Sequence, residues 1–126
     1  MNISFTPRDA RKVLVGIRSC VGVGSLVAPR KLGALFGVDV ENNEAAIYPL
    51  RLFGARELFM AAPFVLGASE EIATLALQGG IAVDGADVLA ATAAGATGGL
   101  EKRSAVMAGA VAVVAVGLGA YALTDR

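Results

Sequence analysis

The sequence predicts an all-α protein, a bundle of four transmembrane helices that run antiparallel in up-down-up-down order. The chain is 56% hydrophobic and only 17% charged, against about 25% charged residues in an ordinary soluble domain. Four hydrophobic segments approach the roughly 20 residues that a helix needs to cross a bilayer core. Two of the three connections are short, which makes successive helices antiparallel. All 126 residues are therefore expected to form a single integral membrane domain.

The first helix is expected at residues 13–28, between a basic head and Pro29. A basic head before a short apolar run also describes a signal peptide. Arg18 inside the run argues against that, and so do the three further hydrophobic segments. Arg18 is a candidate member of a charge network within the spans, although its place close to the start of the helix also allows its long side chain to reach back to the membrane surface. Gly22 and Ser25 share its helix face, which indicates a packing seam.

The second and third helices are expected at residues 47–67 and 72–96, joined by a short turn. Residues 29–46 form the one long connection, interpreted as a loop with one interfacial turn rather than as a dedicated binding loop. Both helices are rich in alanine, and both carry charges. A charge at the centre of a span costs roughly 2.5 to 3.5 kcal/mol on insertion scales. The third helix, with two aspartates, is therefore expected to depend on its neighbours for insertion.

The fourth helix, residues 104–123, is the clearest because it contains no charge. Orientation is weakly specified, since the two sides of the membrane would carry equal numbers of basic residues. The basic head of the first helix favours cytoplasmic N- and C-termini. The sequence thus predicts a multi-pass protein of the cell inner (plasma) membrane.

Six ionisable residues lie within the expected spans, three basic and three acidic: Arg18, Arg51, Arg56, Glu57, Asp84 and Asp87. Charges inside spans are rare and face a bundle interior or water. Asp84 and Asp87 share one face of the third helix. Counted from the turn between the second and third helices, Arg56 lies at about the depth of Asp84 and Arg51 at that of Asp87. We therefore expect these two pairs, although the two arginines lie about 140° apart around an ideal helix.

The residue types exclude several kinds of chemistry. Without histidine, the chain lacks the commonest general base and metal ligand. A single cysteine, Cys20, cannot form an internal disulfide or a thiolate metal site. The formal net charge of zero leaves no basic surplus for nucleic acid. We accordingly expect no metal, no cofactor and no catalytic residue.

Three short elements carry a family resemblance: the stretch 51–58 with its pattern R-x-x-G-x-R-E, the run Phe36-Gly37-Val38 after Pro29, and the aspartate pair of the third helix. In these elements the chain resembles an uncharacterised family of small four-helix bacterial integral membrane proteins, a domain of unknown function that is DoxX-like in build. Glu57 stands where that family typically has aspartate. The resemblance implies a four-helix membrane fold and no established activity.

Three functions compete. The favoured one is a small structural or accessory membrane protein without enzymatic activity, a homo-oligomer or a subunit of a membrane complex, in which the charges fix the helix register. The alternative is a transporter or binder of a small molecule, proton-coupled or not, with the charges as its polar site. A membrane enzyme acting on lipid or quinone, with Arg51 or Arg56 holding an anion, is less favoured, because no nucleophile or metal site accompanies the arginines. For each of these three functions, the lipid bilayer is an expected partner.

Overall fold

The computed structural model describes residues 3–125, and within them the protein is all helical. This confirms the predicted all-α class. The elements in chain order are α1 (Pro7–Val27), α2 (Pro29–Leu35), a 3₁₀ turn (Glu44–Ala46), α3 (Ile47–Val65), α4 (Glu70–Thr97) and α5 (Lys102–Ala122).

The helix ends follow local chemistry that hydropathy does not register. α1 begins at Pro7, before its apolar run, because Thr6 and Asp9 form a capping box around the first turn. It ends at Val27, since a residue that precedes proline, here Ala28, disfavours the helical conformation. Gly98, with φ of 79°, terminates α4 in the left-handed region. The apolar pattern therefore gave the existence of these helices better than their ends.

The capping box predicts a pH-dependent α1 terminus. The backbone N–H and the hydroxyl of Thr6 both donate to the Asp9 carboxylate and lower its pKa below the ordinary value. A lowered pKa stabilises the folded end above the unfolded pKa, and this contribution is lost as the pH falls through the folded value. Below about pH 4 we expect weaker protection of the amides in the first turn of α1, measured as their exchange rate relative to that of an unstructured peptide at the same pH. The Asp9→Asn variant should lack this pH dependence; an identical profile in the two proteins would contradict the assignment.

The long connection is more structured than the expected loop. It contains the two-turn helix α2 and the 3₁₀ turn. Between them Gly37 adopts a positive φ of 73°, and its carbonyl accepts a hydrogen bond of 2.8 Å from the Ser104 hydroxyl at the start of α5. Val40 is buried beside Gly33 of α2. These contacts fix residues 36–40 in place between α2 and the start of α5.

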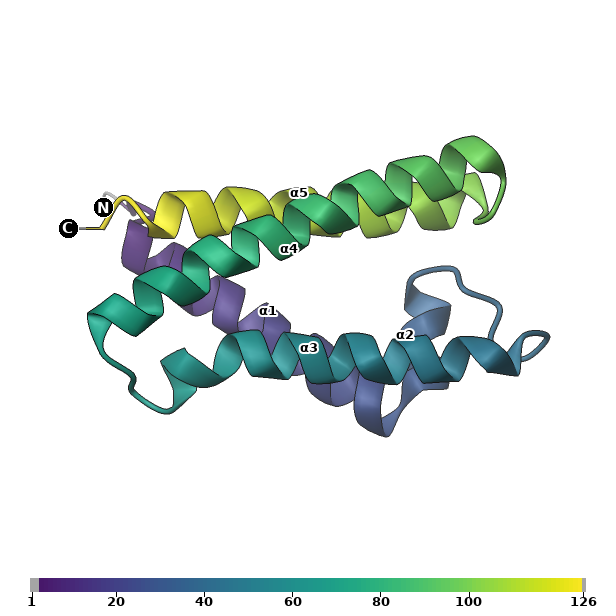
Figure 1. Cartoon of the computed structure of the whole chain (residues 1–126), viewed down its shortest axis with the longest axis horizontal. Helices are drawn as coiled ribbons and strands as arrows, with labels where there is room; N and C mark the ends of the chain where they lie inside the picture. Colours follow the sequence, from purple (N-terminus) through teal and green to yellow (C-terminus); the bar gives the residue numbers. More distant parts are fainter. Residues whose placement is uncertain (1–2, 126) are drawn as a thin grey trace.

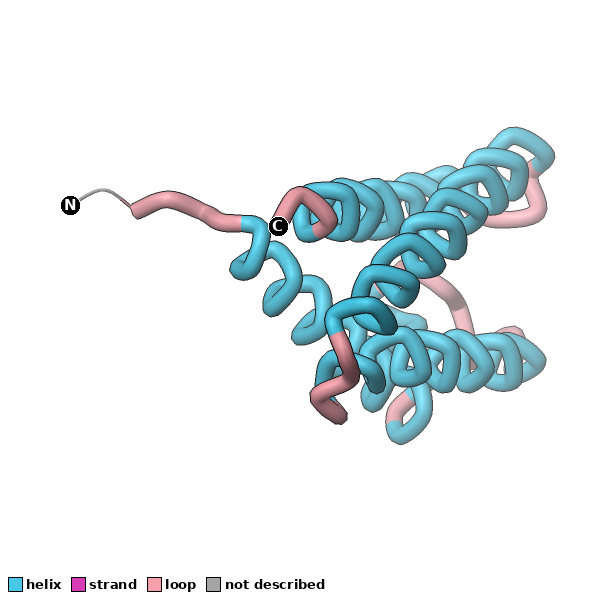
Figure 2. Tube along the Cα trace, turned by 60° about the vertical axis from the view of Figure 1, so that its left-hand side comes forward, coloured by secondary structure: helices cyan, strands magenta, loops and turns pink. Residues whose placement is uncertain are grey.

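The long helices form two pairs that diverge. α1 packs along α3, and α4 packs along α5, while α3 and α4 have few residues in contact. Successive long helices alternate in direction, and the two pairs separate toward the end that carries α2 and the α4–α5 loop (Figure 1). The same separation is visible in the second view (Figure 2). The arrangement is thus an open wedge of two helix pairs, and the predicted bundle of four transmembrane helices is not confirmed.

The apolar core lies at the narrow end of the wedge, where α1 packs against α5 and a leucine of α4 joins them. It contains Ala10, Leu14, Leu77, Ala115 and Ala122. Both termini lie at this end (Figure 1). They are joined by a hydrogen bond of 2.7 Å from the Tyr121 hydroxyl to the Phe5 carbonyl. This end is closed by packing, which leaves the other end open.

Two helices of the described chain, α4 and α5, are long and apolar enough to cross a membrane. α1 and α3 do not meet that test. α3 carries three charges within its 19 residues, and the first half of α1 is strongly charged. The four predicted spans are therefore reduced to two candidate spans by this criterion.

Candidate functional site

Arg18 is the centre of a buried ion network that joins three helices. Its side chain, 4% exposed, donates from Nη1 to Glu57 of α3 at 2.9 Å and from Nη2 to Asp84 of α4 at 2.5 Å. A further bond of 3.3 Å joins Nη1 to Asp84. Both carboxylates are almost fully buried. One guanidinium thus connects the α1–α3 pair to the α4–α5 pair.

A second ion pair lies beside the first and is more accessible. Arg56 of α3 donates from Nη2 and Nη1 to the two oxygens of Asp87, at 2.6 and 3.1 Å. The same guanidinium reaches Glu57 at 3.4 Å and lies over the Phe53 ring, 4.9 Å from its centroid. About a third of each side chain of the pair is exposed. Glu57 therefore links the two pairs into one network of five residues.

This geometry corrects the pairing that the sequence predicted. Asp84 pairs with Arg18 rather than with Arg56, and Asp87 pairs with Arg56 rather than with Arg51. Arg51 is exposed and donates from Nε to the Leu26 carbonyl at 3.4 Å, so it lies outside the network. The reason is the angular separation of the two arginines on α3, which lets only one of them face α4.

Of the two positions open to Arg18, the structure has the buried one, within the charge network, and not the membrane surface. Gly80 of α4 explains why Arg18 points inward. A Cβ built on Gly80 would lie 2.9 Å from Nη2 of Arg18, so the absence of a side chain there creates the space for the guanidinium. A charged group in such a position is stable only when its partners are in place, and Glu57 and Asp84 supply them.

Gly54 positions the two charged residues that follow it on α3. A Cβ on Gly54 would lie 2.7 Å from the Gly22 carbonyl oxygen and 2.8 Å from the Ser25 Cβ. α1 and α3 therefore cross at near backbone contact, on the predicted seam of α1. This close approach brings Glu57, one turn further along α3, within reach of Arg18.

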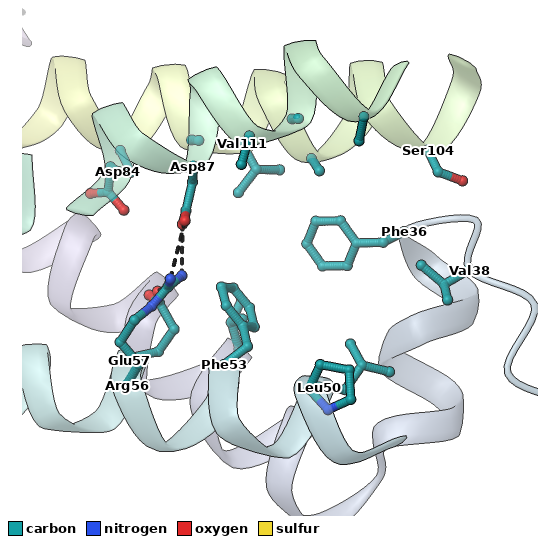
Figure 3. A pocket seen from close by; sticks show the side chains of 18 of the residues that line it. Phe36, Val38, Leu50, Phe53, Arg56, Glu57, Asp84, Asp87, Ser104 and Val111 are labelled. Carbon is teal, nitrogen blue, oxygen red and sulfur yellow. Dashed lines mark hydrogen bonds and ion pairs between the residues drawn. The ribbon is translucent and has the colours of Figure 1, made fainter. Parts of the chain in front are cut away.

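A cavity of about 510 Å³ extends from the ion network toward the open end of the wedge. Its walls are mainly apolar, with small alanines from α4 and α5 on one side. Phe36, Leu50 and Phe53 lie on the opposite side, and the Arg56–Asp87 pair marks the inner end (Figure 3). The cavity is therefore a long apolar space with a charged end.

The three elements that carry the family resemblance all contribute to this cavity. Phe36 and Val38 come from the run after α2, Phe53 and Arg56 from the R-x-x-G-x-R-E stretch, and Asp87 from α4. The sequence analysis did not assign Phe36, Val38, Phe53 or Ser104 to a site. Phe36, Val38 and Phe53 shared one signal, their membership of these short elements, since apolar side chains do not stand out in an apolar chain; Ser104 belongs to none of these elements.

The charged residues offer no obvious metal site. Within residues 3–125, no group of three or more Cys, Asp or Glu side chains is arranged to hold a metal ion. Glu57, Asp84 and Asp87 instead face guanidinium groups. The network can fix helix register, and its accessible pair can meet the polar end of a ligand.

Fold and site together define an all-helical protein with two candidate membrane spans, a buried ion network and an amphiphilic cavity. No protein family, no curated protein and no solved structure matches the chain. Its function is therefore inferred from the geometry of the site.

Proposed function

We propose that the chain is a small multi-pass integral membrane protein whose cavity binds an amphiphilic small molecule. The observation that carries the proposal is the cavity, whose apolar walls end on the Arg56–Asp87 pair (Figure 3). Its volume of about 510 Å³ falls within the roughly 300–1,000 Å³ of small-molecule sites. An alkyl or isoprenoid chain fits the walls, and a polar head fits the charged end.

Four membrane spans are part of this proposal. Arg18 and Glu57 turn inward, and the outward faces of α1 and α3 carry exposed apolar residues, among them Val23, Leu52 and Phe59. α4 and α5 likewise expose Leu75, Leu89, Val106, Val113 and Val114. Apolar surface on all four long helices suits lipid better than water. Paired internal charges allow α1 and α3 to enter the bilayer despite their low hydropathy.

The proposal also covers the orientation of the chain in the membrane and the family to which it belongs. Both termini lie at one end of the molecule (Figure 1), as an even number of spans requires. The basic residues before α1 favour the cytoplasmic side, hence an inner-membrane protein with its termini inside. The joint contribution of the three resembling elements to one cavity supports membership of the small four-helix membrane family that is DoxX-like in build.

The test is photolabelling of the protein in nanodiscs with a neutral alkyl alcohol that carries a diazirine, competed with unlabelled decanol. We expect saturable labelling of the cavity lining, with Phe36 and Phe53 among the modified residues. Ala94→Phe fills the cavity from α4 and should lower the saturable labelling about tenfold. Its matched control is Ala93→Phe, at an exposed neighbouring position outside the cavity lining, which should label as the parent does. Equal labelling of both variants would refute the cavity as a binding site.

A second candidate function is that of an accessory subunit, in which a helix of a partner or of a second copy occupies the wedge. The observation that favours it is the small contact between α3 and α4, which leaves the wedge open. Native mass spectrometry of the protein extracted gently from its membranes separates the two. A bound small molecule on a monomer supports the binder, whereas a defined oligomer or a stoichiometric protein partner supports the subunit.

A further inference from the structure

The ion network at the inner end of the cavity contains unequal numbers of positive and negative groups. Arg18 and Arg56 supply two positive charges, and Glu57, Asp84 and Asp87 supply three negative ones when ionised. The six charged residues within the expected spans, three basic and three acidic, would together carry no net charge. The structure removes one positive charge from the cluster by placing Arg51 on the Leu26 carbonyl instead.

The remaining lining residues do not restore the balance. Of the described residues that line the cavity, those supplied by α5 and by the segment after α2 include no charged side chain. Ser104, the polar one among them, donates its hydroxyl hydrogen to the Gly37 carbonyl. The cluster therefore faces the cavity with one formal negative charge in excess.

The excess lies with Arg18, whose single guanidinium serves two carboxylates, while Asp87 is the acidic group of the network that a ligand can reach. Arg18 is buried, and its Nη1 and Nη2 are engaged with Glu57 and Asp84. Arg56 uses Nη1 and Nη2 on Asp87 and also shares Nη2 with Glu57. Its Nε is buried, so a ligand cannot reach that donor. Each oxygen of Asp87 accepts one of these bonds, and a carboxylate oxygen can accept two. About a third of the Asp87 side chain is exposed, so the unused acceptor capacity lies at the accessible end of the network.

We infer that the ligand of this cavity is an amphiphilic monovalent cation, with its ammonium-type head against Asp87 and its alkyl part along the apolar walls. This inference rests on the proposed binding function. In a low-dielectric site the one excess negative charge of the cluster dominates the choice of ligand. A cationic head neutralises the cluster, whereas an anionic head would add a second excess negative charge. The Phe36 ring also lines the cavity, and an aromatic ring suits a cation; the Phe53 ring already has the Arg56 guanidinium over it.

The experiment measures how three unlabelled amphiphiles with the same alkyl chain compete with the neutral diazirine probe. The competitors are decyltrimethylammonium, decanol and decyl sulfate, applied to nanodiscs of zwitterionic lipid. We expect the ammonium compound to compete at a concentration at least about tenfold lower than the sulfate compound, with decanol between them. Two substitutions change the charge of the cluster in opposite directions. Asp87→Asn should bring the two concentrations close together, and Arg56→Gln should separate them further.

The outcomes separate a failure of the cationic assignment from a failure of the proposed binding function. If Ala94→Phe leaves the labelling intact, the cavity does not bind amphiphiles and both fail. If the cavity binds decanol but prefers the sulfate, or shows no preference, only the cationic assignment is wrong. A preference for the ammonium compound that neither substitution alters would also overturn the assignment. In each variant, competition by decanol shows that the cavity is still folded. If one variant fails to fold, the other is sufficient for the test.

Discussion

Replacement of Arg18 by methionine is expected to destabilise the protein more than any other single substitution in the network. The change leaves Glu57 and Asp84, both almost fully buried, without their shared guanidinium. Removal of one partner from a buried ion pair costs about 3–5 kcal/mol. The loss is measured as a lower midpoint of thermal unfolding in detergent.

The matched control is Arg51→Met on α3, which removes an exposed guanidinium with one weak hydrogen bond to a backbone carbonyl. Its effect should be within about 0.5 kcal/mol, as for ordinary surface changes. The double variant Arg18→Met with Asp84→Asn should recover part of the lost stability, because it removes one of the two uncompensated charges. If Arg51→Met proves as damaging as Arg18→Met, the network described for α1, α3 and α4 is wrong.

Replacement of Gly54 by alanine is expected to separate α1 from α3. The added methyl would meet the Gly22 backbone and the Ser25 side chain at less than 3 Å, and backbone cannot move aside cheaply. Overpacking of this kind typically costs about 1–3 kcal/mol, more than the roughly 0.5–1 kcal/mol that alanine returns by its helix propensity. The net loss is measured by the same unfolding midpoint.

Gly85→Ala in α4 is the control, because a Cβ there meets nothing within 4 Å. This variant should be as stable as the parent or more stable, by up to about 1 kcal/mol. A Gly54→Ala protein that behaves in the same way would show that the close crossing of α1 and α3 does not contribute to the fold.

Local patterns along the chain were sufficient for much of the architecture. The apolar runs placed helices near α1, α3, α4 and α5, since 3.6-residue periodicity and length are properties of a segment by itself. The seam of Gly22 and Ser25 and the shared face of Asp84 and Asp87 follow from the same geometry. α2 was missed because a seven-residue helix has too few turns for its pattern to be distinguished from a loop.

The partners of the charges could not be read in the same way. Counting residues from a turn gives depth along a helix, and on depth alone Arg51 matched Asp87. The direction in which a side chain points also depends on how the helices rotate and cross. That crossing is set by the contact of Gly54 with Gly22 and by the space above Gly80, which are meetings between distant parts of the chain.

The sequence by itself determined the helical class, the approximate place of each long helix and the charged residues of α3 and α4 that face inward, apart from Arg51. The tertiary structure decided which charges pair, that the helices open into a wedge, and that a cavity ends on Asp87. The physical reason is that periodicity and hydropathy are local, whereas pairing and cavity shape depend on the angles at which helices cross. Those angles are fixed by glycine contacts between segments far apart in the chain.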